Sequence, residues 1–175
     1  MNEDAAGSQD AQGGSSGLSI DLTYIAEEDR VRMTLRKVGA DSVDWWWTRR
    51  MTLPVLRVWV DKLDEVPLPA LTSVPWMPSP QGRDLAQEHA LSLEFDGPRS
   101  HPVARQGAAQ SYLPTTIKLN VTSTDCVLEM LAGQVSTRLT FTRRETHAML
   151  EALTLHARKA GWLEAVKLPE WLGVG

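Results

Sequence analysis

The chain has 175 residues, of which 42% are hydrophobic and 23% charged, so it has enough apolar side chains for one globular domain of ordinary size. The net charge is −4, but the first 17 residues carry three of the 22 acidic side chains and no Lys or Arg. The remainder therefore holds 19 acidic against 18 basic residues, and this near-neutral charge argues against a general polyanion-binding protein.

The location of the protein is predicted from what its sequence lacks. A single cysteine, Cys126, excludes an internal disulfide bond and fits a reducing compartment. No apolar run reaches the roughly 18 residues that a membrane span requires, and the N-terminus lacks the pattern of a secretory signal. We therefore expect a cytoplasmic protein that does not bind a membrane.

Three strands and a helix are predicted in the first part of the chain. Residues 1–17 are small, polar and Gly/Ser-rich, so we expect a disordered tail there. Apolar and polar residues then alternate over 18–24, 30–36 and 43–48, which is typical of half-buried strands. An apolar stripe follows on a predicted helix, which we expect to begin at Thr52 because Pro54 is best tolerated in a first turn.

The pattern of the first part returns later in the chain. Thr48-Arg49-Arg50 recurs as Thr142-Arg143-Arg144, after a second set of three alternating segments and before a second amphipathic stretch. Thr142 and Glu145 have the spacing of a capping box at the start of that second helix. We predict an α+β fold with an antiparallel sheet built from two duplicated β-β-β-α units, at about 18–64 and 115–161. The units could form one six-stranded sheet or two packed sheets.

The two predicted units are joined by a connector of different composition. Residues 65–114 begin with a proline-rich part that is too apolar for a free linker, so we expect it to lie across the body with Trp76 as an anchor. A short extra helix is predicted over 83–95, followed by an exposed loop to residue 114. Residues 162–175 form an apolar C-terminal tail that docks on the body or on a partner. We expect 18–175 to be a single domain.

The strand and corner of the first unit resemble a known group of proteins. An Asp29-Arg30 strand followed by Trp46-Trp47-Thr48-Arg49-Arg50 is similar to small uncharacterised bacterial proteins, which carry an Asp-Arg strand and a Trp-x-Thr-Arg-Arg corner. The resemblance covers roughly residues 18–63. It implies a bacterial protein and no particular activity.

The repeated arginine pairs are the first candidate binding residues. Arg49, Arg50, Arg143 and Arg144 stand next to two predicted helix N-termini, where the helix dipole favours anions. They could form a pseudo-symmetric site for a phosphate or a carboxylate-bearing peptide. Alternatively, each pair closes its corner by bonding backbone carbonyls or by pairing with Asp44 and Glu145.

The tryptophans divide into predicted core and predicted surface. Trp45 and Trp47 share the inward face of the third strand, whereas Trp46 points to the other face. An exposed Trp46 suggests a protein interface, unless the proline-rich segment covers it. Trp171 in the tail is a further candidate contact, and Trp76 and Trp162 add to the spare aromatic surface.

No catalytic or metal-binding signature is present in the sequence. The four histidines, His89, His101, His147 and His156, lack zinc-type spacing, so we interpret them as surface residues. Asp84, Glu88 and Glu94 have the spacing of a solvated helix face, and Cys126 that of a small buried hydrophobic residue. We expect no cofactor and no enzymatic activity.

These features favour a non-enzymatic interaction or adaptor module that binds another protein, with self-association as a special case. The alternative is a nucleic-acid-binding accessory protein, in which Arg30, Arg32 and Arg36 line a strand face and Trp46 stacks on a base. The near-neutral charge disfavours that alternative. A third hypothesis is an enzyme that uses the arginine pairs to hold a phosphorylated substrate.

Overall fold

The computed structural model describes residues 17–66, 85–96 and 110–173 of the chain. Several sequence-based predictions therefore lie outside the described residues. They are the disordered tail over 1–16, the proline-rich part of the connector with Trp76, Asp84, His101, and most of the loop that follows the short helix.

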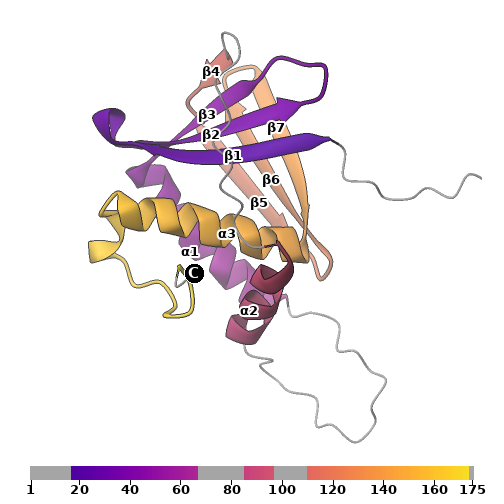
Figure 1. Ribbon diagram of the computed structural model, residues 1–175, viewed down its shortest axis with the longest axis vertical. Coiled ribbons are helices and arrows are strands. Elements are labelled where there is room, and N and C mark those ends of the chain that lie inside the picture. The colour runs from indigo at the N-terminus through magenta and orange to yellow at the C-terminus, as the bar shows by residue number, and fades with distance from the viewer. Residues whose placement is uncertain (1–16, 67–84, 97–109, 174–175) are drawn as a thin grey trace, which may run out of the picture.

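The described residues form two β-sheets with helices along them (Figure 1). The four-stranded sheet has the order β1-β2-β3-β4, with bounds Leu18–Ile25, Arg30–Lys37, Val43–Thr48 and Gln110–Tyr112. The three-stranded sheet has the order β5-β6-β7, with bounds Thr116–Val121, Asp125–Ala132 and Val135–Thr142. The helices are α1 (Arg49–Glu65), α2 (Leu85–Asp96) and α3 (Arg143–Lys159), and two short 3-10 helices cover Ala26–Glu28 and Trp162–Ala165. The α+β class is confirmed, and the strands form two sheets rather than one.

Strand β4 departs from the predicted antiparallel pattern. It pairs in parallel with β3, in the register Val43 to Gln110 and Trp45 to Tyr112. All other strand pairs in the described part are antiparallel. The predicted, wholly antiparallel arrangement is wrong at this one pair. A three-residue strand at the end of a long connector is too short to show an alternating pattern in the sequence.

The two predicted units have the same element order, three antiparallel strands followed by a 17-residue helix. Gly39 and Gly133 adopt positive φ angles of 77° and 59° in the turns before the third strand of each unit. Thr52 donates its hydroxyl to the carbonyl of Thr48 at 2.9 Å, and Thr146 does the same to Thr142 at 2.9 Å. These shared features agree with the predicted repeat, whose origin by duplication stays a prediction.

Helix α1 begins three residues earlier than the sequence pattern predicted, at Arg49 rather than Thr52. Pro54 therefore lies inside the helix, where its missing N–H leaves the carbonyl of Arg50 without an intrahelical donor. Both Arg50 and Pro54 are exposed, so water can bind that carbonyl and the penalty is small. At α3 the predicted capping box is confirmed between Thr142 and Glu145.

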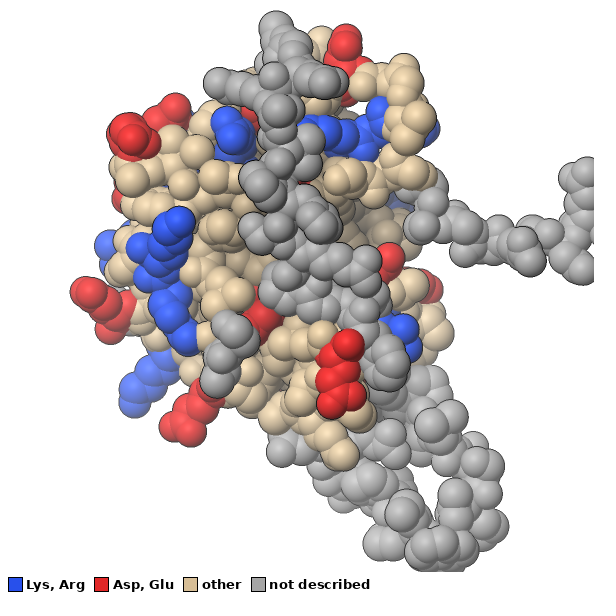
Figure 2. All heavy atoms as spheres, in the orientation of Figure 1, with Lys and Arg blue, Asp and Glu red and all other residues tan. Residues whose placement is uncertain are grey.

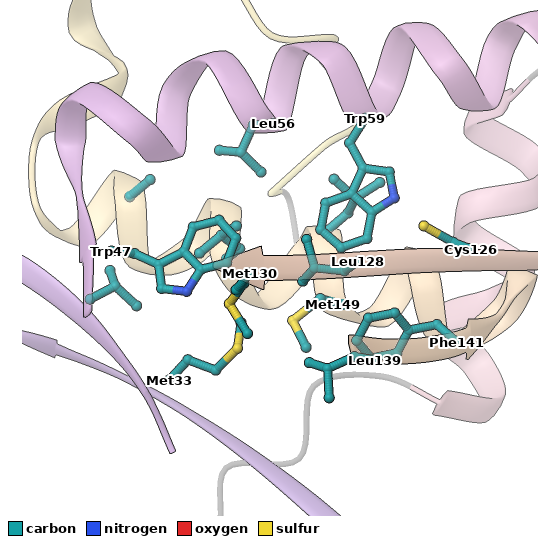
Figure 3. Close-up of a cluster of buried hydrophobic side chains, with 14 of the residues drawn as sticks. Met33, Trp47, Leu56, Trp59, Cys126, Leu128, Met130, Leu139, Phe141 and Met149 are labelled. Carbon is teal, nitrogen blue, oxygen red and sulfur yellow. The ribbon is translucent and has the colours of Figure 1, made fainter. Parts of the chain in front are cut away.

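One hydrophobic core takes side chains from both sheets and from the helices (Figure 3). Trp45 and Trp47 are fully buried, as their alternation predicted. The C-terminal segment also belongs to the body, since Trp162 and Leu172 are each 1% exposed. Of the two docking modes left open for the tail, the structure has the one on the body. Trp162 is therefore not the spare surface residue that was predicted.

None of the described helices combines the length and the apolar character needed to cross a membrane.

Candidate functional site

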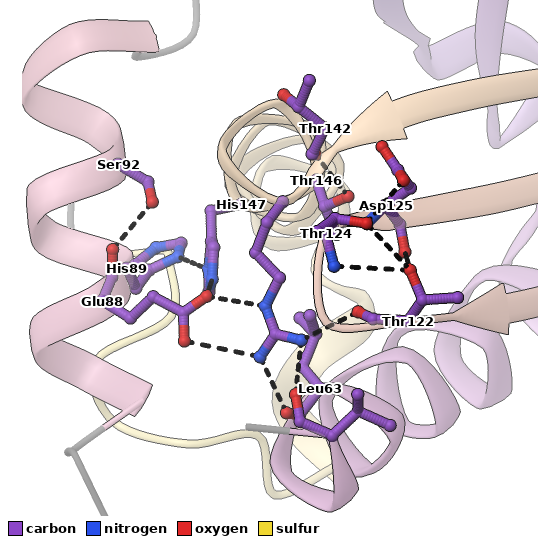
Figure 4. Close-up of polar contacts among 12 residues, drawn as sticks. Leu63, Glu88, His89, Ser92, Thr122, Thr124, Asp125, Thr142, Thr146 and His147 are labelled. Atoms are coloured by element: carbon purple, nitrogen blue, oxygen red, sulfur yellow. Dashed lines mark hydrogen bonds and ion pairs between the residues drawn. The ribbon is translucent and has the colours of Figure 1, made fainter. Parts of the chain in front are cut away.

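A buried ionic cluster joins α2 to α3 (Figure 4). It contains Glu88 and His89 from α2, and Arg143, His147 and Glu151 from α3. The expectation that the histidines lie on the surface is wrong for His89 and His147, which are 2% and 0% exposed. The expectation of a solvated Glu88 is also wrong, because its side chain is 9% exposed. Two helices packed against each other enclose these side chains.

The five side chains form a continuous chain of hydrogen bonds. Nε2 of His89 lies 2.9 Å from Oε2 of Glu151, and Nδ1 of His89 lies 3.1 Å from Nδ1 of His147. Nε2 of His147 lies 2.8 Å from Oε1 of Glu88, which also accepts from Nε of Arg143 at 2.7 Å. Arg143, His147 and Glu151 follow one another at intervals of four residues, so they share one stripe of α3. The four-residue spacing is visible in the sequence. The sequence does not show that Glu88 and His89 of α2 are the partners of these side chains.

The charge state of Glu88 follows from its neighbours. Burial raises the pKa of Glu88, but the hydrogen bonds and positive charges of His147 and Arg143 outweigh burial, so the pKa lies below its ordinary value of 4.5. Ionised Glu88 therefore stabilises the fold above that ordinary value, and the contribution is lost as the pH falls through the lower folded pKa. Near neutral pH the carboxylate is a hydrogen-bond acceptor only.

Arg143 connects the start of α3 to the end of α1. Its side chain donates to the carbonyls of Leu63 at 3.0 Å and Thr122 at 3.2 Å, and also to the carbonyl of Val66. The last carbonyls of a helix have no partner within the helix, so a buried guanidinium supplies the donors they need. Arg143 thus bonds backbone carbonyls, but these belong to other elements than its own corner, and its acidic partner is Glu88 rather than Glu145.

The other predicted arginines lie elsewhere. Arg49, Arg50 and Arg144 are exposed. Arg49 begins α1, and the carbonyl that Arg143 binds belongs to Leu63, 14 residues further along the same helix. At 1.5 Å per residue this places the Arg49 backbone about 21 Å from that carbonyl. Arg143 and the Arg49 pair therefore do not converge on a joint anion site.

Trp171, predicted as a partner contact, lies against the ionic cluster. Its half-buried ring is centred 4.8 Å from the ring of His89. Two residues later, the amide of Gly173 donates to Oε2 of Glu151 at 2.7 Å. The end of the described chain thus packs beside the junction of α2 and α3.

The described residues contain no group of three or more His, Cys, Asp or Glu side chains arranged to hold a metal ion. Cys126 is buried, as predicted, and burial raises the pKa of its thiol to about 11. The nearby polar groups of Trp59 and Thr146 and the charge of Arg143 only partly offset that effect on the pKa. The Cys126 thiol is therefore protonated at neutral pH and a poor nucleophile.

Trp46 lies on the outer face of the four-stranded sheet, where it was predicted. The strand register places it opposite Arg32, and the guanidinium carbon lies 5.9 Å from the ring centroid. Both side chains are half-buried, so part of this cation–π pair faces solvent. The proline-rich segment considered as a cover for Trp46 lies outside the described residues.

Carboxylates accompany the arginines on this face. Arg30 pairs with Glu28 at 3.7 Å and Arg36 with Asp21 at 4.0 Å. Figure 2 shows basic and acidic side chains interspersed among the described residues on the side of the molecule in view. The two ion pairs themselves make the outer face of the four-stranded sheet mixed in charge rather than a continuous basic patch.

Comparison of the chain with protein-family models, curated proteins and solved structures finds no match that meets the significance threshold.

Proposed function

We propose that the protein is a non-enzymatic protein-binding module whose contact surface is the outer face of the four-stranded sheet. The observation that carries this proposal is the Arg32–Trp46 pair, held opposite each other by strand register and partly open to solvent. Trp and Arg are enriched among the residues that contribute most to protein–protein affinity. A preformed pair on a rigid sheet also loses little conformational entropy on binding.

The charge pattern on this face favours a protein partner over a nucleic acid. Nucleic-acid binding rests on cationic groups that are free to replace the counterions of the phosphates. Here Glu28 and Asp21 stand beside Arg30 and Arg36 and offset their charge locally. A protein partner can match such alternating charges at the rim of an interface and cover Trp46 at its centre.

The ionic cluster does not support an enzymatic function. Its titratable groups are bonded to one another, and their side chains are at most 9% exposed. A general acid or base must reach the proton that it transfers in a substrate. The cluster instead has the bonding of a structural junction between helices.

The proposal is tested by capture from native lysate with the tagged full-length protein, with and without nuclease. Wild type is compared with Arg32→Ala/Trp46→Ala, and the matched control is Arg57→Ala/Val58→Ala, an exposed basic and apolar pair on α1. We expect a stoichiometric protein partner that survives nuclease, is retained by the control and is lost with the sheet-face variant. Circular dichroism checks that each variant is folded.

Other results would reject the proposal. A partner that binds the sheet-face variant as well as wild type would place the interface elsewhere. Bound material that disappears after nuclease treatment or at high salt would favour the nucleic-acid alternative. The partner includes a second copy of this chain as a special case, which sedimentation of the purified protein distinguishes. We further propose that the protein acts in the cytoplasm and that its two β-β-β-α units arose by duplication.

A further inference from the structure

The hydrogen bonds of the ionic cluster require one more proton than its side chains ordinarily carry. Three bonds run in series from Glu151 through His89 and His147 to Glu88. Each bond needs one proton between its two heavy atoms. Two neutral imidazoles and two carboxylates supply only two protons. The series is complete only when a third proton is present, whichever tautomers the rings adopt.

The formal charges of these five side chains agree with that proton count. Two carboxylates and the Arg143 guanidinium sum to −1 when both imidazoles are neutral. One extra proton brings the sum to zero, in a place where the side chains are at most 9% exposed. Without the proton, one of the three contacts would also hold two acceptors face to face.

The third proton belongs on the imidazole pair. Glu88 accepts from Arg143 as well as from His147, and its pKa lies below the ordinary value. Oε2 of Glu151 accepts the Gly173 amide at 2.7 Å, so this oxygen already has one donor. Both carboxylates are thus bonded as acceptors, and the two rings share three protons between them.

Among the described residues, the elements packed around the cluster supply mainly polar backbone groups. The end of α1 and the β5–β6 turn supply carbonyls that bind Arg143. The C-terminal segment supplies the Trp171 ring and the Gly173 amide. Arg158 binds the carbonyls of Leu172 and Gly173, but it is exposed, so solvent screens its charge. Cys126 is near enough to Arg143 to sense its charge, but its thiol is neutral.

We propose that the ionic cluster is a pH-sensitive latch, in which one proton shared by His89 and His147 holds α2 against α3. In the described part of the chain, α2 packs mainly on α3, and the series of bonds spans that contact. This inference is independent of the protein-binding face proposed above, because it concerns a different part of the molecule.

The latch predicts that α2 docks on α3 most strongly at one pH and more weakly above and below it. A solvent-exposed histidine exchanges its proton near pH about 6.5, so two released histidines hold on average one extra proton at that pH. Above it, the docked state holds more protons than the released state, so docking weakens by up to about tenfold per pH unit. Below that pH, the released state holds up to two extra protons, whereas the docked state holds one. Docking therefore weakens at lower pH as well.

Hydrogen exchange of the full chain tests the latch. Protection of the α2 amides, corrected for intrinsic exchange, is measured from pH 6.5 to 8.5 with the β6 amides as internal reference. We expect α2 protection in wild type to fall by up to about tenfold per pH unit. The control His156→Gln changes a half-buried histidine on α3 outside the cluster and keeps this dependence. His89→Gln/His147→Gln removes it. Constant α2 protection in wild type across this range would overturn the proposal.

A second measurement does not depend on the double variant keeping its fold. Imidazole nitrogen NMR of the wild-type protein near pH 7 counts the protons bound to His89 and His147. The latch requires three protons on the four ring nitrogens. Two protons, the number for neutral rings, would contradict it. One equivalent of a metal ion bound between the two Nδ1 atoms, detected by elemental analysis, would contradict it as well.

Discussion

At the scale of the residue, the same amino acid at equivalent positions has two different roles. Arg49 and Arg143 are each the first residue of a 17-residue helix and each follows a threonine N-cap. Arg49 is exposed, whereas Arg143 is 6% exposed and bonds Glu88 and three backbone carbonyls. The difference arises because α2 and the end of α1 meet the start of α3.

Replacing Arg143 tests how much its side chain contributes to the free energy of unfolding. Arg143→Met removes the ionic partner of Glu88 and the donors to the carbonyls of Leu63, Val66 and Thr122. We expect a loss of about 3–5 kcal/mol in the free energy of unfolding, because a buried carboxylate loses its guanidinium partner and buried carbonyls lose their donors. Urea denaturation near neutral pH measures it.

Arg49→Met is the matched control at the start of α1. The Arg49 side chain is exposed, so we expect little change in stability. Equal losses from the two variants would show that the burial and bonding of Arg143 are not what stabilises the junction.

At the scale of the element, the two long helices begin differently. Thr142 accepts the amide of Glu145 at 3.2 Å and donates its own amide to Oε2 of Glu145 at 2.8 Å. Thr48 makes no such side-chain bond at the start of α1. The capping box needs a carboxylate or amide three residues after the cap, and Met51 occupies that position in the first helix. The two units therefore share the shape of the corner but not its capping.

The difference in capping predicts different effects of one substitution. Thr142→Ala should lower the free energy of unfolding by about 1 kcal/mol, because an amide at the helix start loses its acceptor. Thr48→Ala should lower it less, since no capping bond is lost. Thermal and urea unfolding of both variants measure the effect. A loss for Thr48→Ala as large as for Thr142→Ala would be the contrary result.

Helix α2 shows why element boundaries were easier to predict than element surroundings. The sequence predicted a short helix over 83–95, and the structure has Leu85–Asp96. The prediction assigned Glu88 to a solvated face, yet the side chains of Glu88 and His89 enter the ionic cluster. Local patterning describes a helix, but it does not identify the surface that the helix meets.

At the scale of the whole molecule, the C-terminal segment ties distant parts of the chain together. The indole N–H of Trp162 donates to Asp29 at 2.7 Å, and its ring meets that of Tyr24 edge-on at 5.9 Å. Further on, Gly173 packs against α3, with its amide on Glu151. The segment after α3 thus reaches the β1–β2 turn near one end and the ionic cluster near the other.

The close approach of Gly173 to α3 gives a prediction with a matched control. A Cβ atom at Gly173 would lie 2.7 Å from Cγ2 of the buried Thr154, whereas one at Gly39 would meet nothing within 4 Å. Both glycines have φ near +76°. Gly39→Ala should therefore cost about 1–2 kcal/mol from backbone strain alone.

Gly173→Ala should cost more than Gly39→Ala, because steric overlap with Thr154 adds to the same strain. Urea unfolding of both variants gives the difference. Equal losses, or a larger loss at Gly39, would mean that the terminal segment is not packed as described.

The sequence by itself determined the elements whose causes are local. Alternation located every described strand except β4 and the inward faces of Trp45 and Trp47, and the spacing of Thr142 and Glu145 identified the capping box. These features depend on neighbours a few residues apart, which a sequence shows directly. The proposed sheet face also had a local signal, since Arg32 and Trp46 were both assigned to outer strand faces.

Only the tertiary structure decided which elements meet. The parallel pairing of β4, the docking of the tail and the ionic cluster all join segments far apart in the chain. His89 and His147 are 58 residues apart, and each looks like a surface histidine when its own helix is considered alone. Their burial depends on two helix faces that enclose them together, and no local pattern encodes that contact.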